Sequence, residues 1–265
     1  MPRSPRQYFR WLLVQFGLFD KTAFRFAIDE IRAQDTFIVS FPKSGNTWLR
    51  FLIAHLISER NDISFRNIDG LVPDIYTSAS LVNKLPSPRF IKTHNNWFGD
   101  FPKSIYIVRD YRDVLVSYYH YQLAAKEFSG SFSNYIRSID TLHPFGKWKA
   151  HVESALAFET RFPDRIHFLR YEDLLASPNE TLEKLVQFLG IMPKRSIAEA
   201  IAQCEFSRLQ KNEKEKGSLF HDISGKLFFR EGKSGSWKNN FSGDDLAFVM
   251  NENGPLLKKL GYENA

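Results

Sequence analysis

The stretch Thr36-Phe-Ile-Val-Ser-Phe-Pro-Lys-Ser-Gly-Asn-Thr-Trp48 decides the fold. Its apolar, β-branched residues 37–39 predict a buried strand, and Pro42 with Gly45 then breaks the extended run. From Thr47 onward apolar side chains recur every three to four residues, which predicts a helix. A strand, a tight loop and a helix in this order form a phosphate cradle, because N–H groups at a helix start lack intrahelical partners.

The loop also carries side chains that suit an anion. Lys43 offers a full charge, and Ser44, Asn46 and Thr47 offer hydrogen-bond donors. The loop is not a Walker A sequence, which needs its lysine directly after a second glycine, whereas Lys43 precedes the only glycine. Taken alone, the loop leaves open an ordinary strand–helix corner with a solvated lysine.

Composition narrows the class of protein. A chain of 265 residues with 43% hydrophobic residues predicts one large α/β domain or two small ones. The single cysteine, Cys204, excludes an internal disulfide and favours a reducing compartment. The formal charge of +6 suits an anionic ligand and equally a nucleic acid. Residues 1–20 mix arginines with aromatic residues. Their apolar stretch is too short to span a bilayer, and they lack the cleavage site of a signal peptide. They predict a helix packed on the domain, and a helix on a membrane surface is the alternative.

Further elements follow from apolar spacing and from glycine, proline and polar clusters. We expect helices at 21–33, 131–162, 195–213 (one or two) and 244–261, strands at 89–94, 104–109 and 165–171, a surface connection at 60–87, and a mobile loop at 214–236.

Two of these strands end in residues suited to phosphate-type chemistry. In a parallel α/β sheet, ligands collect beyond the carboxyl ends of the strands. Lys92 and His94 have the same parity and face one side of an extended strand, although a lone histidine is more often a structural residue. Arg109 ends the next strand and Ser117 follows eight residues later, where an arginine can grip phosphate with a bidentate fork.

These motifs together resemble the PAPS-dependent sulfotransferases, close to the cytosolic type (PAPS is 3′-phosphoadenylyl sulfate). Phe-Pro-Lys-Ser-Gly-Asn-Thr-Trp48 looks like the family's 5′-phosphosulfate loop, and Lys-Thr-His94 like the segment with the catalytic base. The Arg109…Ser117 pair looks like the 3′-phosphate site. The resemblance implies a single P-loop-like α/β domain: a central, mostly parallel sheet with helices on both faces, divided into residues 1–34, 35–241 and 242–265.

The resemblance also assigns roles to residues. His94 would be the base, with Lys43 and Lys92 as the other catalytic residues. The nucleotide would contact Lys43, Ser44, Gly45, Asn46, Thr47, Trp48, Arg109, Ser117, Tyr171, Phe206, Arg230, Glu231 and Gly232.

Some positions depart from the family pattern. Glu231 replaces the usual lysine and Ser236 the usual aspartate of the C-terminal motif. A carboxylate repels phosphate, so we expect Glu231 to turn away and Lys233 to supply the missing charge. Ser242-Gly243 and Ala247 replace residues of the family's dimer motif, which leaves the oligomeric state open.

The functional expectation is sulfuryl transfer from PAPS to a hydroxyl or amine of a small, apolar or aromatic acceptor, in the cytoplasm. The co-product is adenosine 3′,5′-bisphosphate (PAP), and neither a metal nor a nucleic acid is expected. An ATP-dependent P-loop kinase, a basic nucleic-acid module and a PAPS-binding protein without activity are the alternatives.

Overall fold

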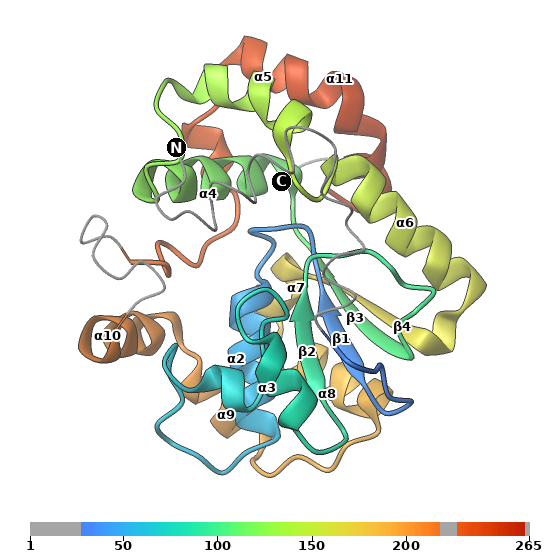
Figure 1. Cartoon of the computed structure of the whole chain (residues 1–265). Helices are drawn as coiled ribbons and strands as arrows, with labels where there is room; N and C mark the ends of the chain where they lie inside the picture. The colour runs from blue at the N-terminus through green and yellow to red at the C-terminus, as the bar shows by residue number, and fades with distance from the viewer. Residues whose placement is uncertain (1–27, 218–226, 263–265) are drawn as a thin grey trace.

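A computed structural model describes residues 28–217 and 227–262 of the chain. Its centre is a four-stranded sheet in the order β2-β1-β3-β4, and every neighbouring pair is parallel. This confirms the predicted parallel α/β sheet (Figure 1). The strands are β1 (Thr36–Val39), β2 (Phe90–Thr93), β3 (Lys103–Val108) and β4 (Ile166–Arg170).

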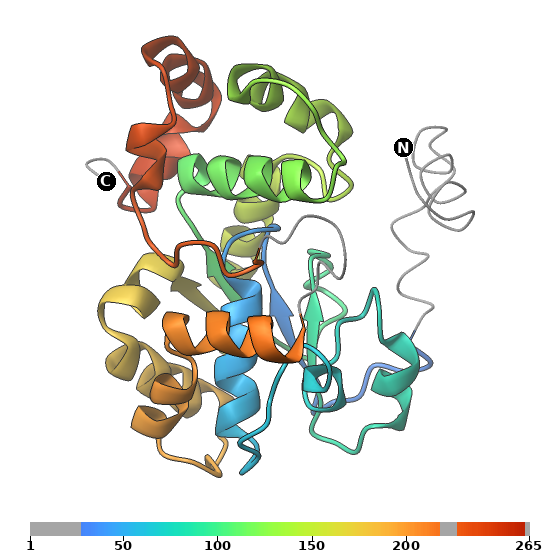
Figure 2. The same ribbon diagram turned by 90° about the vertical axis from the view of Figure 1, so that its left-hand side faces the viewer.

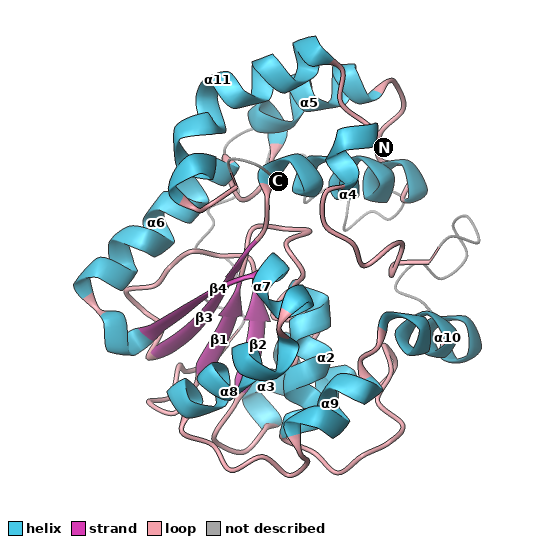
Figure 3. Ribbon diagram, turned by 180° about the vertical axis from the view of Figure 1, so that it is seen from behind, coloured by secondary structure: helices cyan, strands magenta, loops and turns pink. Residues whose placement is uncertain are grey.

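The sheet is buried on both faces because alternate side chains of its strands enter two different cores. Phe37 and Val39 pack in one core with Trp148 of α6 (Trp148–Arg161). Ile38 packs in the other with Leu49 of α2 (Asn46–Leu56). Figure 3 shows α6 on one side of the strands and α2 on the other, as the resemblance implied.

The remaining helices surround this centre, and α4, α5 and α11 pack together beyond the carboxyl ends of the strands (Figures 1 and 2). They are α3 (Ala79–Lys84), α4 (Tyr111–Ala124), α5 (Phe132–Leu142), α7 (Tyr171–Ala176), α8 (Pro178–Leu189), α9 (Ile197–Gln203), α10 (Phe206–Lys216) and α11 (Gly243–Lys259), with 3-10 turns η2 (Ile68–Gly70), η3 (Pro163–Arg165) and η4 (Ser236–Asn239).

Two helix predictions were wrong in part. Residues 28–33 form bends and a turn, because the Glu30 carbonyl accepts a hydrogen bond from Arg89 (2.8 Å) and the Arg32 N–H donates to Asp35 (2.7 Å). Those backbone groups are therefore not available to a helix. The predicted helix 131–162 is two helices, because Pro144 cannot continue a helix and Gly146 adopts a left-handed φ of 73°.

The end of α10 corrects a third boundary, since the helix runs to Lys216 and takes the start of the predicted loop 214–236. Residues 1–20, with their proposed packed or membrane-surface helix, lie outside the described residues, as do 21–27 and 218–226. Within the described ranges, no helix is both long and apolar enough to cross a membrane.

Candidate functional site

The loop between β1 and α2 curls tightly against α7. Lys43 and Gly45 have left-handed φ values of 68° and 98°. A Cβ on Gly45 would lie 2.5 Å from a ring carbon of Tyr171, so only glycine fits here. Gly45 is also the N-cap of α2 and brings no side-chain cap. The first N–H groups of α2 are thus left for an anion.

Lys43 lies in a cluster of positive charges. Its ammonium nitrogen is 4.1 Å from the centre of the Phe228 ring and 4.5 Å from that of Tyr121. Burial, and then the charges of Arg109, Arg230 and Lys92, together lower the pKa of Lys43 from 10.5 to about 7. An anion bound among these cations would relieve their mutual repulsion.

The residues after Lys43 shape the cradle through bonds within the protein. The Asn46 amide donates to the Ile38 carbonyl (3.1 Å) and to Ser40 Oγ (3.2 Å), which ties the helix start to β1. The Trp48 indole N–H donates to the Cys204 carbonyl (3.1 Å). Thr47 is half-buried beside them. Nucleotide contact by these three residues stays a prediction.

Arg109 sits directly after β3 and faces the loop. Its guanidinium carbon lies 4.4 Å from the centre of the Tyr171 ring, at the start of α7. Its Nη2 donates to the Lys233 carbonyl (2.8 Å) and its Nη1 to the Lys43 carbonyl (3.4 Å). Ser117 lies two turns further along the chain, half-buried on α4.

Two carboxylates bring the C-terminal segment to Arg109. Asp113 is fully buried and accepts three hydrogen bonds of 2.7 to 3.0 Å from residues 235–237. Glu213 accepts the N–H groups of residues 228 and 229 at 2.6 and 3.1 Å. Sequence reasoning missed both anchors; for Asp113 the only signal was its place between Arg109 and Ser117.

The segment between these anchors carries Arg230, Glu231 and Gly232. The Glu231 carboxylate pairs with Arg230 at 2.6 Å, and its turning away from a bound phosphate stays a prediction. Two flexible, half-exposed side chains of opposite charge on neighbouring residues readily meet in this way. Gly232 has a φ of 62°, and a Cβ there would lie 2.3 Å from the Phe206 ring. Lys233 is exposed.

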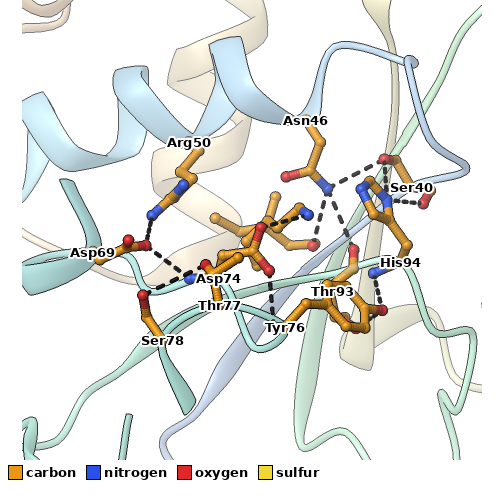
Figure 4. Close-up of polar contacts among 12 residues, drawn as sticks. Ser40, Asn46, Arg50, Asp69, Asp74, Tyr76, Thr77, Ser78, Thr93 and His94 are labelled. Atoms are coloured by element: carbon orange, nitrogen blue, oxygen red, sulfur yellow. Dashed lines mark hydrogen bonds and ion pairs between the residues drawn. The ribbon is translucent and has the colours of Figure 1, made fainter. Parts of the chain in front are cut away.

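The His94 ring contacts Ser40, as Figure 4 shows, and this contact fixes its tautomer. Its Nδ1 lies 2.8 Å from the Ser40 carbonyl, which can only accept, so Nδ1 carries the proton and Nε2 is the basic nitrogen. The His94 backbone N–H donates to the Tyr76 hydroxyl (2.8 Å). Burial, and then the charge of Lys92, hold the pKa of His94 well below its ordinary value, which keeps the ring neutral and able to accept a proton at neutral pH.

Sequence reasoning missed the hydrogen-bond partners of Lys92 and His94. The Lys92 ammonium donates to Asp74 (2.8 Å), and burial lowers the pKa of Lys92 although Asp74 opposes this. His151 on α6 lies 2.9 Å from the His94 carbonyl through Nε2 and 2.8 Å from the Tyr106 hydroxyl through Nδ1. The connection 60–87 had no readable pattern, and His151 had none beyond its place in a predicted helix.

The site fits a nucleotide with phosphate groups at two places. Ser44 Oγ and Arg109 Nε are buried and have no hydrogen-bond partner among the described residues. Such atoms are costly unless a ligand satisfies them. They stand with four cationic side chains at the carboxyl edge of the sheet, next to a neutral histidine. Across the described parts of the chain, no group of three or more His, Cys, Asp or Glu is arranged to hold a metal ion.

A parallel sheet with helices on both faces and a tight, lysine-bearing loop after its first strand is a P-loop-like α/β fold. The sulfotransferase domain family model matches residues 33–261, and the chain belongs to this family. It is an enzyme that transfers a sulfuryl group from PAPS to an acceptor. This decides against the kinase, the nucleic-acid module and the inactive binding protein.

Individual relatives agree with this assignment. The chain is 29% identical over 240 residues to sulfotransferase 1 family member D1 of Mus musculus, covering 80% of each chain. It is 30% identical over 250 residues to flavonol 3-sulfotransferase of Flaveria bidentis, covering 78% of this chain and 77% of that protein. A mouse sulfotransferase complexed with PAP shares the fold, with a TM-score of 0.69 and 23% identity over 91% of this chain and 94% of that one.

Proposed function

We propose that His94 is the general base of the transfer. The single observation that carries this proposal is the hydrogen bond between His94 Nδ1 and the Ser40 carbonyl, because it leaves Nε2 as the basic nitrogen next to the phosphate loop. In the proposed reaction, Nε2 takes the proton of the acceptor hydroxyl. The acceptor oxygen bonds to sulfur while the bond from sulfur to the nucleotide phosphate oxygen breaks, and the electron pair leaves with PAP.

Lys43 and Lys92 stabilise the charge that moves during this step. Lys43 meets the negative charge that grows on the departing phosphate, and Lys92 holds the sulfuryl oxygens. The cluster of Lys43, Lys92, Arg109 and Arg230 supports these roles, since their mutual repulsion already lowers the pKa of Lys43. Fixed charges in a partly buried site act more strongly than the same charges in water.

The other site residues bind the nucleotide. Arg109, Ser117, Arg230 and Gly232 hold the 3′-phosphate, and residues 44–48 hold the 5′-phosphosulfate. The partnerless Arg109 Nε supports the first assignment, and the partnerless Ser44 Oγ supports the second. The remaining contacts that we propose are to the adenosine, through Tyr171 and Phe206, while Glu231 lies beside the 3′-phosphate site through its ion pair with Arg230.

The acceptor that we propose is a small molecule whose hydroxyl is attached to an apolar, ring-containing body. Aromatic rings beside the base support this, since Phe145 lies 5.3 Å from the His94 ring and 5.6 Å from the Tyr76 ring. One relative is named for a flavonol, and two structural neighbours were solved with androsterone or retinol. An amine is the second acceptor type, and the cytoplasm is the compartment we propose, supported by the single, buried Cys204.

The test compares His94→Ala with His167→Ala. His167 is a half-buried histidine of β4 whose ring packs on Phe188, so it is a matched substitution on another strand. Each variant is titrated with PAP by calorimetry and assayed with PAPS and a panel of phenols and alcohols. His94→Ala should bind PAP as the parent does and lose turnover by roughly two to four powers of ten. His167→Ala should keep its turnover; a His94→Ala enzyme that also kept it would disprove the role of the base.

A further inference from the structure

A short segment of the connection runs alongside β2 and matches its register. The Lys92 N–H donates to the Pro73 carbonyl (2.9 Å), and the Ile75 N–H donates to the Lys92 carbonyl (3.1 Å). These bonds form a parallel bridge in which Asp74 lies directly opposite Lys92. The chain turns directly after this bridge, because the Asp74 carbonyl accepts from the N–H groups of Thr77 (3.1 Å) and Ser78 (2.8 Å), and this turn holds Tyr76 close to Asp74.

Asp74 and Tyr76 each contact one of two residues with a proposed catalytic role, Lys92 of β2 and His94 directly after that strand. The Asp74 carboxylate accepts from the Lys92 ammonium (2.8 Å). The Tyr76 hydroxyl accepts from the His94 N–H (2.8 Å), as Figure 4 shows. Asp74 and Lys92 are both largely buried, with 17% and 10% of their side chains exposed. A buried ion pair is costly to break, which favours one fixed arrangement.

Asp74 is itself held in place from behind. Its backbone N–H donates to Asp69 Oδ1 (3.1 Å), and Asp69 forms an ion pair with Arg50 of α2. The Asp74 side chain also accepts from the Tyr76 N–H (2.9 Å), so the turn that presents Tyr76 depends on it. The carboxylate has little freedom to leave Lys92.

We propose that Asp74 is a positioning residue for sulfuryl transfer: its carboxylate holds the Lys92 ammonium beside His94 and keeps it charged. This inference rests on the role proposed above for Lys92. An ammonium group has three donors, and one bond to Asp74 leaves two for the sulfuryl oxygens.

The charges around Lys92 explain why a carboxylate is needed. Burial disfavours the ammonium form, and two cations, Arg50 and Lys43, add repulsion. Asp74 and, more weakly, Asp69 oppose them. The neutral His94 imidazole and the Tyr76 ring, whose centre is 5.1 Å from the Lys92 ammonium nitrogen, also lie near it. Without Asp74, the balance moves toward a neutral amine, which stabilises a sulfuryl oxygen poorly.

The experiment replaces Asp74 by asparagine, which keeps a hydrogen-bond acceptor and removes the charge. We expect kcat to fall by about tenfold to a hundredfold, the scale seen for residues that orient metal ligands, while PAP affinity stays near that of the parent. The melting temperature should fall, because the substitution leaves the buried Lys92 charge without its partner. The alkaline limb of the kcat profile should move to lower pH, because loss of a neighbouring negative charge lowers the pKa of Lys92. The control is Asp62→Asn, which removes an exposed carboxylate of the same connection that pairs with Arg60. It should change neither kcat nor the alkaline limb.

Lys92→Met separates the two hypotheses. If Lys92→Met keeps full turnover, the role proposed for Lys92 fails. If Lys92→Met is impaired while Asp74→Asn keeps both turnover and pH limb, only the positioning role fails. If both hold, the double variant should be no slower than Lys92→Met alone, since Asp74 then acts through Lys92.

Asp74→Glu guards against an asparagine variant that does not fold. It keeps the charge and moves it by one methylene group, so we expect a smaller loss of turnover and an alkaline limb at the parental pH. A glutamate variant whose limb shifted downward would overturn the proposal, because charge would then not be what Asp74 supplies.

Discussion

Binding of PAP should return a proton to Lys43. In the free protein, burial and then the charges of Arg109, Arg230 and Lys92 lower its pKa from 10.5 to about 7. About half of the Lys43 side chains are therefore neutral at pH 7. A bound phosphate supplies the opposite charge and raises this pKa, so the complex holds a full proton that the free protein holds only in part.

The size of the effect follows from the pKa of about 7. Binding should take up about half a proton at pH 7 and about nine-tenths at pH 8. Because the protonated form binds, affinity should fall about fivefold between pH 7 and pH 8 and approach tenfold per unit above that. Calorimetric titration with PAP in two buffers of different ionisation enthalpy measures the uptake directly. Above pH 7 the phosphates, with a pKa of about 6, are ionised and contribute little.

Two lysine variants test the assignment. Lys43→Met should bind PAP more weakly, with no proton uptake and an affinity independent of pH between 7 and 9. Lys103→Met is the matched control, because the Lys103 ammonium donates to the Phe188 carbonyl, away from the loop; it should keep the parental uptake. Titration of the parent at pH 8 without proton uptake, or equal uptake in Lys43→Met, would refute the reasoning.

Two further predictions concern the 3′-phosphate. Arg109→Ala should weaken PAP binding by roughly tenfold to a hundredfold, the scale of a hydrogen bond to a charged group, and leave adenosine 5′-phosphate affinity nearly unchanged; calorimetry with both nucleotides checks this, and equal losses would contradict it. Glu231→Gln should strengthen PAP binding by about two- to fivefold, since an exposed ion pair with Arg230 is worth under about 1 kcal/mol and would no longer compete. Weaker binding by Glu231→Gln would instead mean that the carboxylate supports the site.

The fold could be predicted where local pattern and tertiary packing agree. Residues 37–39 are apolar on both faces, and a strand buried between two helical layers needs that pattern. The expected helix at 21–33 shows the opposite case. Its spacing was helical, yet Arg89, 59 residues away from Glu30, takes the carbonyl at that position. No local pattern contains that contact.

The loop between β1 and α2 could be predicted for a similar reason. Position 45 has no room for a side chain beside Tyr171, so it requires glycine. Position 43 combines a positive φ with a long, cationic side chain. Few residue types satisfy such demands, so the motif is specific. The pairing of Glu231 with Arg230 was not readable, because two exposed, flexible side chains next to each other can take many arrangements.

The same reasoning separates the groups that would face the ligand from the groups that hold them. In the proposed reaction, the chemistry of a phosphosulfate restricts Lys92 to a cation and His94 to a base, so the sequence pattern could suggest both. Asp74, Tyr76 and His151 only have to form hydrogen bonds with Lys92 and His94. Another hydrogen-bonding side chain at another position could form the same bonds. These residues could be identified only from the structure, where residues 73–76 and α6 lie next to β2. Substitutions of Asp74, Tyr76 or His151 should therefore change the rate of transfer and its pH dependence and leave the affinity for the nucleotide unchanged.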